Sequence, residues 1–234
     1  MNNTLNEMRI TESELLELKE FVKDYNLVRE RLYLQLIPVV GNEDMLKDVP
    51  YTEMEDLAII YRIQIKEEGN YIVAVTVNNN LLKHYGIDKE TLHLDALRSA
   101  PKVAPAVFVS MDEMLRELHE GLEKEYPFAG SESELKLYVA TNEKGHHGAS
   151  VILYPMYLES LRDKLGGNFY IFPSSIHEVI IMRDDYDMNL SDMRKMVKSI
   201  NGSVVALEDR LSDNVYHYDG NLGRITVAQE EGVA

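Results

Sequence analysis

The spacing of apolar and polar residues divides the first part of the chain into one helix and three strands. Apolar residues recur every three or four positions behind Thr11 and Glu14, a capping box, so a helix of about four turns is expected from Thr11. From Val28 the period changes to two, which indicates a half-buried strand that ends at Pro38. Residues 57–65 and 71–77 are rich in β-branched and aromatic side chains, and the short turn between them predicts a hairpin.

Three helices are expected in the middle of the chain, because polar capping residues precede three runs of helically spaced residues. The expected caps are Asn78, Asp88 and the Ser110–Glu113 capping box. The first helix should end at Gly86, the second before Pro101 and the third before Pro127.

The second half of the chain also alternates between strand patterns and helix patterns. Strands are expected over residues 135–141, 149–154, 169–172 and 179–182, with one helix after Pro155 and another capped by Ser191. A final hairpin should pair residues 215–218 with residues 224–227. These elements predict an α+β fold with mainly antiparallel sheet and helices packed on one face.

The order strand, turn, strand, helix occurs over residues 57–85 and again over residues 135–165, which suggests two related sub-domains. The segment Ala129-Gly130-Ser131-Glu132-Ser133 is the expected linker between them. The predicted organisation is a disordered N-terminus over residues 1–10, α+β sub-domains over 11–127 and 134–228, and a disordered tail over 229–234. The pattern leaves open whether the two halves share one sheet.

Composition narrows the classes of partner and site. The 24 Lys and Arg residues against 40 Asp and Glu residues give a net charge of −16, which argues against direct binding to nucleic acid or to an anionic membrane. The absence of cysteine excludes disulfides, thiolate zinc sites and iron–sulfur clusters. No dinucleotide, phosphate-loop or zincin motif occurs, so no cofactor is expected. With no secretory or membrane-spanning pattern, a cytoplasmic location is expected.

Five segments carry a resemblance to a known family. They are residues 56–61 (DLAIIY), 137–142 (LYVATN), 148–155 (GASVILYP), 169–180 (FYIFPSSIHEVI) and 211–216 (LSDNVY). Their order and spacing resemble the bacterial domain-of-unknown-function 5688 family, common in anaerobic Firmicutes, from about Val28 to Val227. Longer members carry a further N-terminal region that this chain is expected to lack. The family has no assigned activity, so the resemblance implies fold boundaries and a cytosolic setting but no chemistry.

Ser175 and His177 are the candidates for nucleophilic catalysis. On an extended segment they would share one face, with Cα atoms about 6 to 7 Å apart, so that a hydroxyl and an imidazole could come into reach. A catalytic triad also needs an orienting acid, which Asp213 could supply. The alternative is a polar turn at Pro173-Ser174-Ser175 whose hydroxyls bond to the nearby backbone, with His177 beginning the returning strand.

His146 and His147 are the candidates for metal binding. They lie in a turn between Gly145 and Gly148, and together with His177 or a carboxylate they could form a nitrogen–oxygen site. Adjacent histidines project in different directions, so an exposed polar turn is the alternative, and no bound metal is expected.

Three classes of function remain. The leading hypothesis is a non-enzymatic protein-binding or regulatory module whose partner is another protein. The second is a hydrolase-like or metal-assisted enzyme that uses the region of Ser175 and His177 with the turn at residues 145–148. The third is an acidic inhibitor that occupies the nucleic-acid-binding groove of another protein, because a charge of −16 permits mimicry of a phosphate backbone. Neither the partner nor the oligomeric state follows from the sequence.

Overall fold

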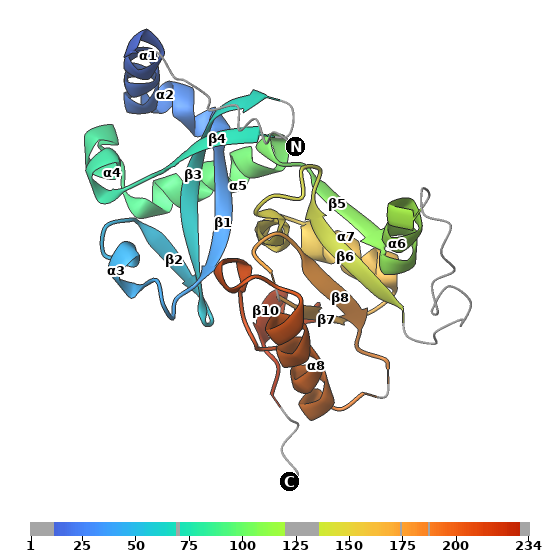
Figure 1. The fold of residues 1–234 in the computed structure, drawn as a ribbon. Helices are drawn as coiled ribbons and strands as arrows, with labels where there is room; N and C mark the ends of the chain where they lie inside the picture. The colour runs from blue at the N-terminus through green and yellow to red at the C-terminus, as the bar shows by residue number, and fades with distance from the viewer. Residues whose placement is uncertain (1–11, 69–70, 120–135, 174, 187, 230–234) are drawn as a thin grey trace.

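The strands of the protein form two antiparallel sheets that meet near the middle of the molecule (Figure 1). The computed structural model describes residues 12–68, 71–119, 136–173, 175–186 and 188–229. Within these residues every strand pair is antiparallel, and helices and strands are mixed along the chain, which confirms the predicted α+β class.

The first sheet is built around the long strand β3 (Leu57–Glu68). Strand β1 (Leu32–Pro38) pairs along one edge of β3, while β2 (Tyr51–Met54) and β4 (Tyr71–Thr76) pair in succession along the other. The β3–β4 pair confirms the predicted hairpin. Every residue of β1 except Pro38 is buried, so β1 is covered on both faces and not on one as its alternating pattern suggested.

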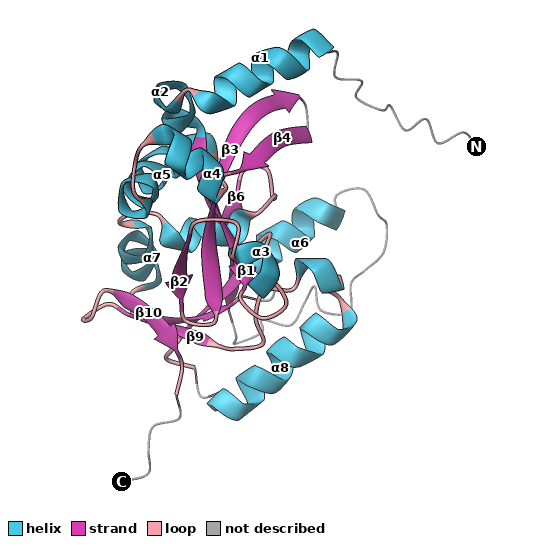
Figure 2. Cartoon of the chain, turned by 90° about the vertical axis from the view of Figure 1, so that its left-hand side faces the viewer, coloured by secondary structure: helices cyan, strands magenta, loops and turns pink. Residues whose placement is uncertain are grey.

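Helices cover one face of the first sheet. Leu34, Leu57 and Ile63 point to this face and pack in the same core as Leu92 and Ala96 of α5 (Lys89–Val103). The shorter helices α1 (Glu12–Lys23), α2 (Tyr25–Val28) and α4 (Asn79–Tyr85) lie at the end of the sheet near β4 (Figure 2). Beside the opposite face, α3 (Glu43–Leu46) closes a smaller apolar cluster.

The second sheet has the order β10-β9-β7-β8-β6-β5. Its strands are β5 (Ala106–Ser110), β6 (Leu137–Asn142), β7 (Phe169–Phe172), β8 (Val179–Arg183), β9 (Tyr216–Asp219) and β10 (Arg224–Val227). Helix α7 (Tyr157–Leu165) shares a core with Phe169 and Ile171, whereas α8 (Leu190–Ser203) packs with Phe172 and Met182. Helices therefore cover both faces of this sheet, in contrast to the single covered face that was expected.

The helix caps read from the sequence are largely confirmed. Asn78 and Asp88 each accept a hydrogen bond from a backbone N–H of the first turn of α4 or α5. At the start of α6 (Met111–His119), Ser110 and Glu113 exchange both bonds of a capping box. Asn189 caps α8 in place of the expected Ser191, because its side chain accepts from the Asp192 N–H.

Three predictions of local structure are wrong. The strand expected from Val28 begins only at Leu32, because Val28 ends α2 and Arg29–Arg31 forms a short 3-10 helix. Residues 149–154 were expected to form a strand, but Gly148–Leu153 forms a 3-10 helix, η2, packed between β6 and β1. Without that strand, the suggested internal repeat loses its second copy. Pro101 lies inside α5 and does not end it, since the helix continues to Val103 and the Ala104 N–H bonds to the Ala100 oxygen.

The two sheets divide the chain earlier than the predicted sub-domain boundary. Strand β5 precedes the expected linker but pairs with β6 of the second sheet, and helix α6 packs against both strands. The chain therefore passes from one sheet to the other near Pro105. The linker at residues 129–133, the N-terminus at 1–10 and most of the tail at 229–234 lie outside the described residues. No helix in the described ranges has both the length and the apolar character that crossing a bilayer requires.

Asp56 joins the two sheets. It lies in the two-residue turn between β2 and β3, next to Glu55, whose φ of 55° is in the left-handed region. Its carboxylate accepts a hydrogen bond of 2.7 Å from the Ser212 hydroxyl and another from the hydroxyl of the buried Tyr216. Burial, together with the hydrogen bond to Asp56, raises the pKa of Tyr216 above its usual value, so the phenol remains a donor at neutral pH.

We expect Asp56→Ala to destabilise the protein by about 1 to 3 kcal/mol, because Ser212 and Tyr216 would both lose an acceptor in a place with little access to water. Chemical denaturation measures the change. Asp44→Ala is the control, since Asp44 forms an exposed ion pair with Lys47 and its loss should cost well under about 1 kcal/mol. Equal effects of the two substitutions would contradict a role for Asp56 in joining the sheets.

Candidate functional site

Three histidines gather where the second sheet faces the first. His146 and His147 lie in the turn after β6, and His177 lies in the connection between β7 and β8. The ring centroids are 4.2 Å apart for His146 and His147, 5.1 Å for His146 and His177, and 5.9 Å for His147 and His177. The structure therefore brings together the histidines that the sequence singled out in two separate segments. We call His146, His147 and His177 the histidine cluster.

Asn142 shapes the turn that carries two members of the cluster. Its side-chain oxygen accepts from the backbone N–H groups of Lys144 and His146, at 3.0 and 3.3 Å, and its amide donates to the His146 oxygen at 2.8 Å. The turn ends in a left-handed backbone conformation at His147, with φ of 53°. A single buried amide thus satisfies the polar backbone of the turn and directs both imidazoles toward His177.

Gly148 allows the turn to approach the His177 segment. A Cβ atom at this position would lie 2.5 Å from the His177 carbonyl oxygen and 2.7 Å from the Asn142 nitrogen, and it would overlap the Thr141 hydroxyl. The Thr141 hydroxyl also donates to the His177 oxygen at 2.8 Å. The two loops are therefore in direct backbone contact, which is possible only because residue 148 has no side chain.

Both ring nitrogens of His177 are engaged by the protein. Nδ1 accepts from the His147 backbone N–H at 3.3 Å, so the ring proton lies on Nε2, which donates to Asp209 Oδ1 at 3.2 Å. Asp209 lies in η3 (Leu207–Asp209), the short helix that follows α8. The imidazole acts here as a bridge between the turn and η3.

Ser175 and Asp213 do not assemble with His177 into a triad. The buried Ser175 hydroxyl accepts from the backbone N–H of His177 at 3.0 Å, the bond that the polar-turn alternative predicts. Asp213 accepts from the Asn201 amide of α8 at 2.7 Å. The carboxylate that contacts His177 belongs to Asp209, which sequence reasoning did not select because no local pattern links it to the histidines.

Arg62 of the first sheet lies near enough to His146 and His147 for its charge to lower the pKa of both. It is a residue of β3, and its guanidinium donates to the Gln35 side-chain oxygen of β1 at 3.0 Å. Nearby, Lys144 of the histidine turn forms an ion pair with Glu67 at the far end of β3. Sequence reasoning also missed Arg62, because it lies some eighty residues from the cluster and alternates with apolar residues like any polar strand position.

Burial and the neighbouring charges lower the pKa values of His146 and His147. Burial, followed by the influence of His146 and Arg62, lowers the pKa of His147 to about 3. Burial, followed by His177 and Arg62, lowers the pKa of His146 as well. Two buried nitrogen atoms at this junction, His147 Nδ1 and Arg62 Nε, have no hydrogen-bond partner in the protein.

A metal site at the histidine cluster would need several ligand side chains that converge on one ion. No three His, Asp or Glu side chains of the described residues are arranged to hold one ion. His177 accounts for this directly, because one ring nitrogen accepts from a backbone N–H and the other donates to Asp209. The proximity of His146 and His147 to His177 was anticipated as one possibility, and the expectation that they bind no metal stays a prediction.

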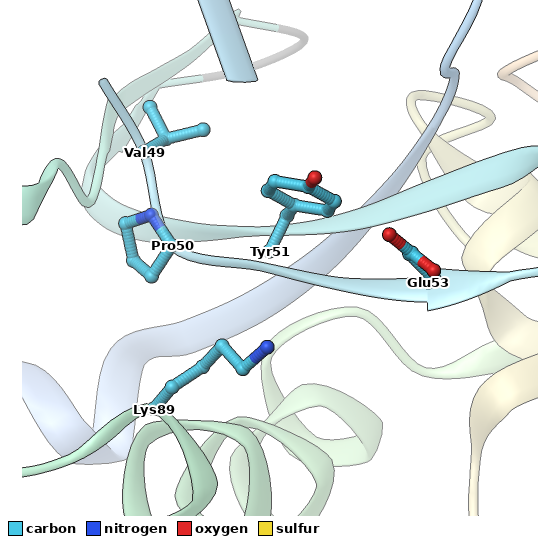
Figure 3. Close-up of a pocket in the computed structure, with 5 residues that line it drawn as sticks. All are labelled: Val49, Pro50, Tyr51, Glu53 and Lys89. Carbon is cyan, nitrogen blue, oxygen red and sulfur yellow. The ribbon is translucent and has the colours of Figure 1, made fainter. Parts of the chain in front are cut away.

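A separate hollow of about 470 Å³ lies beside the first sheet. It is lined by Val49, Pro50, Tyr51, Glu53 and Lys89, and the Lys89 side chain reaches toward β2 from the start of α5 (Figure 3). An amine and a carboxylate in one hollow of low apolar content can bind many small polar molecules weakly, and no side chain here points to one chemistry.

We expect Gly148→Ala to destabilise the protein by about 1 to 3 kcal/mol, because the new methyl group would overlap backbone atoms of both loops. Gly167→Ala is the matched control, since a Cβ at Gly167 meets no atom within 4 Å. Thermal unfolding of both variants measures the difference, and an unchanged melting temperature for Gly148→Ala would show that the loops are not in contact.

We expect the stability of the protein to depend on His147 below neutral pH. Because the pKa of His147 is lowered to about 3 in the folded protein, the unfolded chain binds its proton first as the pH falls below about 6.5. Stability from this residue is therefore present at pH 7 and is lost on acidification. His147→Asn keeps a residue that tolerates the left-handed conformation and removes the titration.

The measurement is the melting temperature of both proteins between about pH 7 and pH 5, the interval that brackets the unfolded-state pKa. The fall in melting temperature should be smaller for His147→Asn than for the wild type. Parallel pH profiles for the two proteins would show that His147 is not held neutral by the fold.

Comparison with known proteins identifies the family but no activity. No curated protein and no solved structure matches the chain. A family described as one of unknown function, DUF5688, matches residues 1–220, which extends the resemblance to segments before Val28. The match spans both sheets as far as β9, including all three members of the histidine cluster, Arg62 and Asp209. The chain belongs to the DUF5688 family of unknown function.

Proposed function

We propose that the protein is a non-enzymatic module that binds another protein through the loop between α8 and η3. This segment, which we call the 204–207 loop, runs from the end of α8 to the first residue of η3, and it presents Val204 and Leu207 to solvent, with 79% and 76% of their surfaces exposed. Exposed apolar side chains that lie close together, with polar groups around them, are typical of protein interfaces. The high exposure of these two side chains is the observation that carries the proposal.

The backbone of the 204–207 loop is held in place, which favours binding. The Arg210 side chain donates to the Val205 oxygen at 3.3 Å, and the Asp209 N–H bonds to the Ala206 oxygen at 3.0 Å. A loop already fixed in one conformation loses little entropy when a partner covers it. Val204 and Leu207 are therefore displayed on a prepared surface.

The geometry favours this function over the hydrolase alternative. A general base needs a ring nitrogen that is available to the nucleophile, and both nitrogens of His177 are engaged with His147 and Asp209. The Ser175 hydroxyl is turned to the His177 backbone N–H. His177 supports the position of η3 and, through it, the neighbouring 204–207 loop.

The acidic surface bears on the remaining alternative, an inhibitor that occupies a nucleic-acid-binding groove. Such an inhibitor would act through many carboxylates, so its binding would weaken steeply with salt, whereas an apolar contact at Val204 and Leu207 would be nearly indifferent to salt.

We include a cytoplasmic location in the proposal, since the chain of net charge −16 has no cysteine that an oxidising compartment could pair.

We expect the tagged protein to capture a partner from its native host, and a Val204→Ser/Leu207→Ser double variant to lose at least about nine-tenths of it, as expected when apolar anchors at an interface are removed. The control is Leu222→Ser, which removes a side chain that is 60% exposed in the β9–β10 turn. Quantitative mass spectrometry of the captured proteins provides the measurement.

Capture should persist when the salt concentration is raised. A partner held equally by the wild type and the double variant would refute the assignment to this loop. Steep loss of the partner with salt would instead support the acidic-inhibitor alternative.

A further inference from the structure

We propose that the junction between Arg62 and the histidine cluster binds a small oxyanion, a phosphate or carboxylate group. The two faces of this junction come from different sheets, with Arg62 on β3 and His146 and His147 on the turn after β6. Oxyanion binding here needs no protein partner, so it can hold or fail independently of the function proposed above.

The first argument is the unpaired charge of Arg62. No carboxylate of the described residues forms an ion pair with its guanidinium, although the chain has 40 acidic residues. Arg62 is only partly exposed, and its hydrogen-bond partners, the Gln35 amide and the Tyr33 phenol, are both neutral groups. Partial burial of a guanidinium costs free energy unless an anion compensates its positive charge. An external oxyanion would supply the negative charge that the protein does not.

The second argument is the pair of nitrogen atoms without partners. Arg62 Nε–H can only donate, and neutral His147 donates from Nδ1 when the ring proton lies there. One oxyanion offers acceptor oxygens to both sheets at once, and hydrogen bonds between a guanidinium and an oxyanion are among the strongest in proteins. The bound anion would thus satisfy two buried groups that each cost stability when left unpaired.

The third argument is the position of the neighbouring groups. Asp209 would repel an anion, but its bond to His177 Nε2 puts it at the opposite end of that ring from Nδ1, where the His147 backbone lies. The exposed His146 ring lies 4.2 Å from the His147 ring and forms the solvent side of the cluster. The proposal requires this exposed side chain to rotate so that an anion can reach His147, and such rotations take nanoseconds or less.

The test is a titration of the purified full chain with inorganic phosphate and, separately, with acetate, at low ionic strength. Histidine ring signals in NMR spectra report the site, and calorimetry measures the affinity. We expect saturable binding of at least one probe, with shifts of the His146 and His147 signals. Saturation by phosphate alone identifies a phosphate ligand, and saturation by acetate alone identifies a carboxylate.

Arg62→Gln should weaken this binding about tenfold or more, because it removes both the charge and the Nε donor. Arg62→Lys keeps the charge, but the lysine ammonium group has no N–H at the position of Nε. Weakened binding is therefore expected for this variant as well. Arg224→Gln is the matched control, since Arg224 is exposed on β10, and its affinity should equal that of the wild type.

His147→Asn serves as a second probe of the site if Arg62→Gln does not fold, and it should also weaken binding. The proposal is overturned if neither probe binds saturably, if the shifts occur away from His146 and His147, or if the folded Arg62 and His147 variants bind as tightly as the wild type.

Discussion

The close backbone contact at Gly148 is the constraint on which the centre of the structure depends. Because this residue has no side chain, the turn after β6 lies directly on the His177 segment. The same contact starts η2, whose apolar residues then fill the space between β6 and β1. One position without a Cβ atom therefore lets the three imidazoles gather and places the start of η2, which packs against β1 of the first sheet.

The local elements were predictable where their signals are local. Capping side chains at Asn78, Asp88 and Ser110 act within one helical turn, so the sequence shows them directly. The strand prediction for residues 149–154, most of which form η2, was wrong because their structure depends on contacts far away along the chain. An apolar run of this length fits a buried strand and a buried helical turn equally well, and the choice was made by its packing between two sheets. Strands β2 and β5 were missed because short edge strands carry little periodicity.

The candidate site shows the same division. His146, His147 and His177 drew notice in the sequence because of their residue type and their turns, and their meeting was one of the possibilities considered. Arg62 and Asp209 complete the site from β3 and η3, far away along the chain, and nothing in their own surroundings marks them. The choice of Asp213 as the orienting acid had no positional basis, and Asp209, four residues earlier, is the carboxylate at His177.

The junction of the two sheets combines two opposite uses of polar groups. At Asp56 the acceptor and its two donors are all supplied by the protein, so that contact is complete and fastens the sheets together. At Arg62 the protein leaves a buried donor without an acceptor, and at His147 it leaves a buried ring nitrogen without a partner, which lowers stability where a fully paired junction would raise it. The proposed oxyanion would complete this second contact, whereas an apolar pair at the same place would be more stable and would bind nothing.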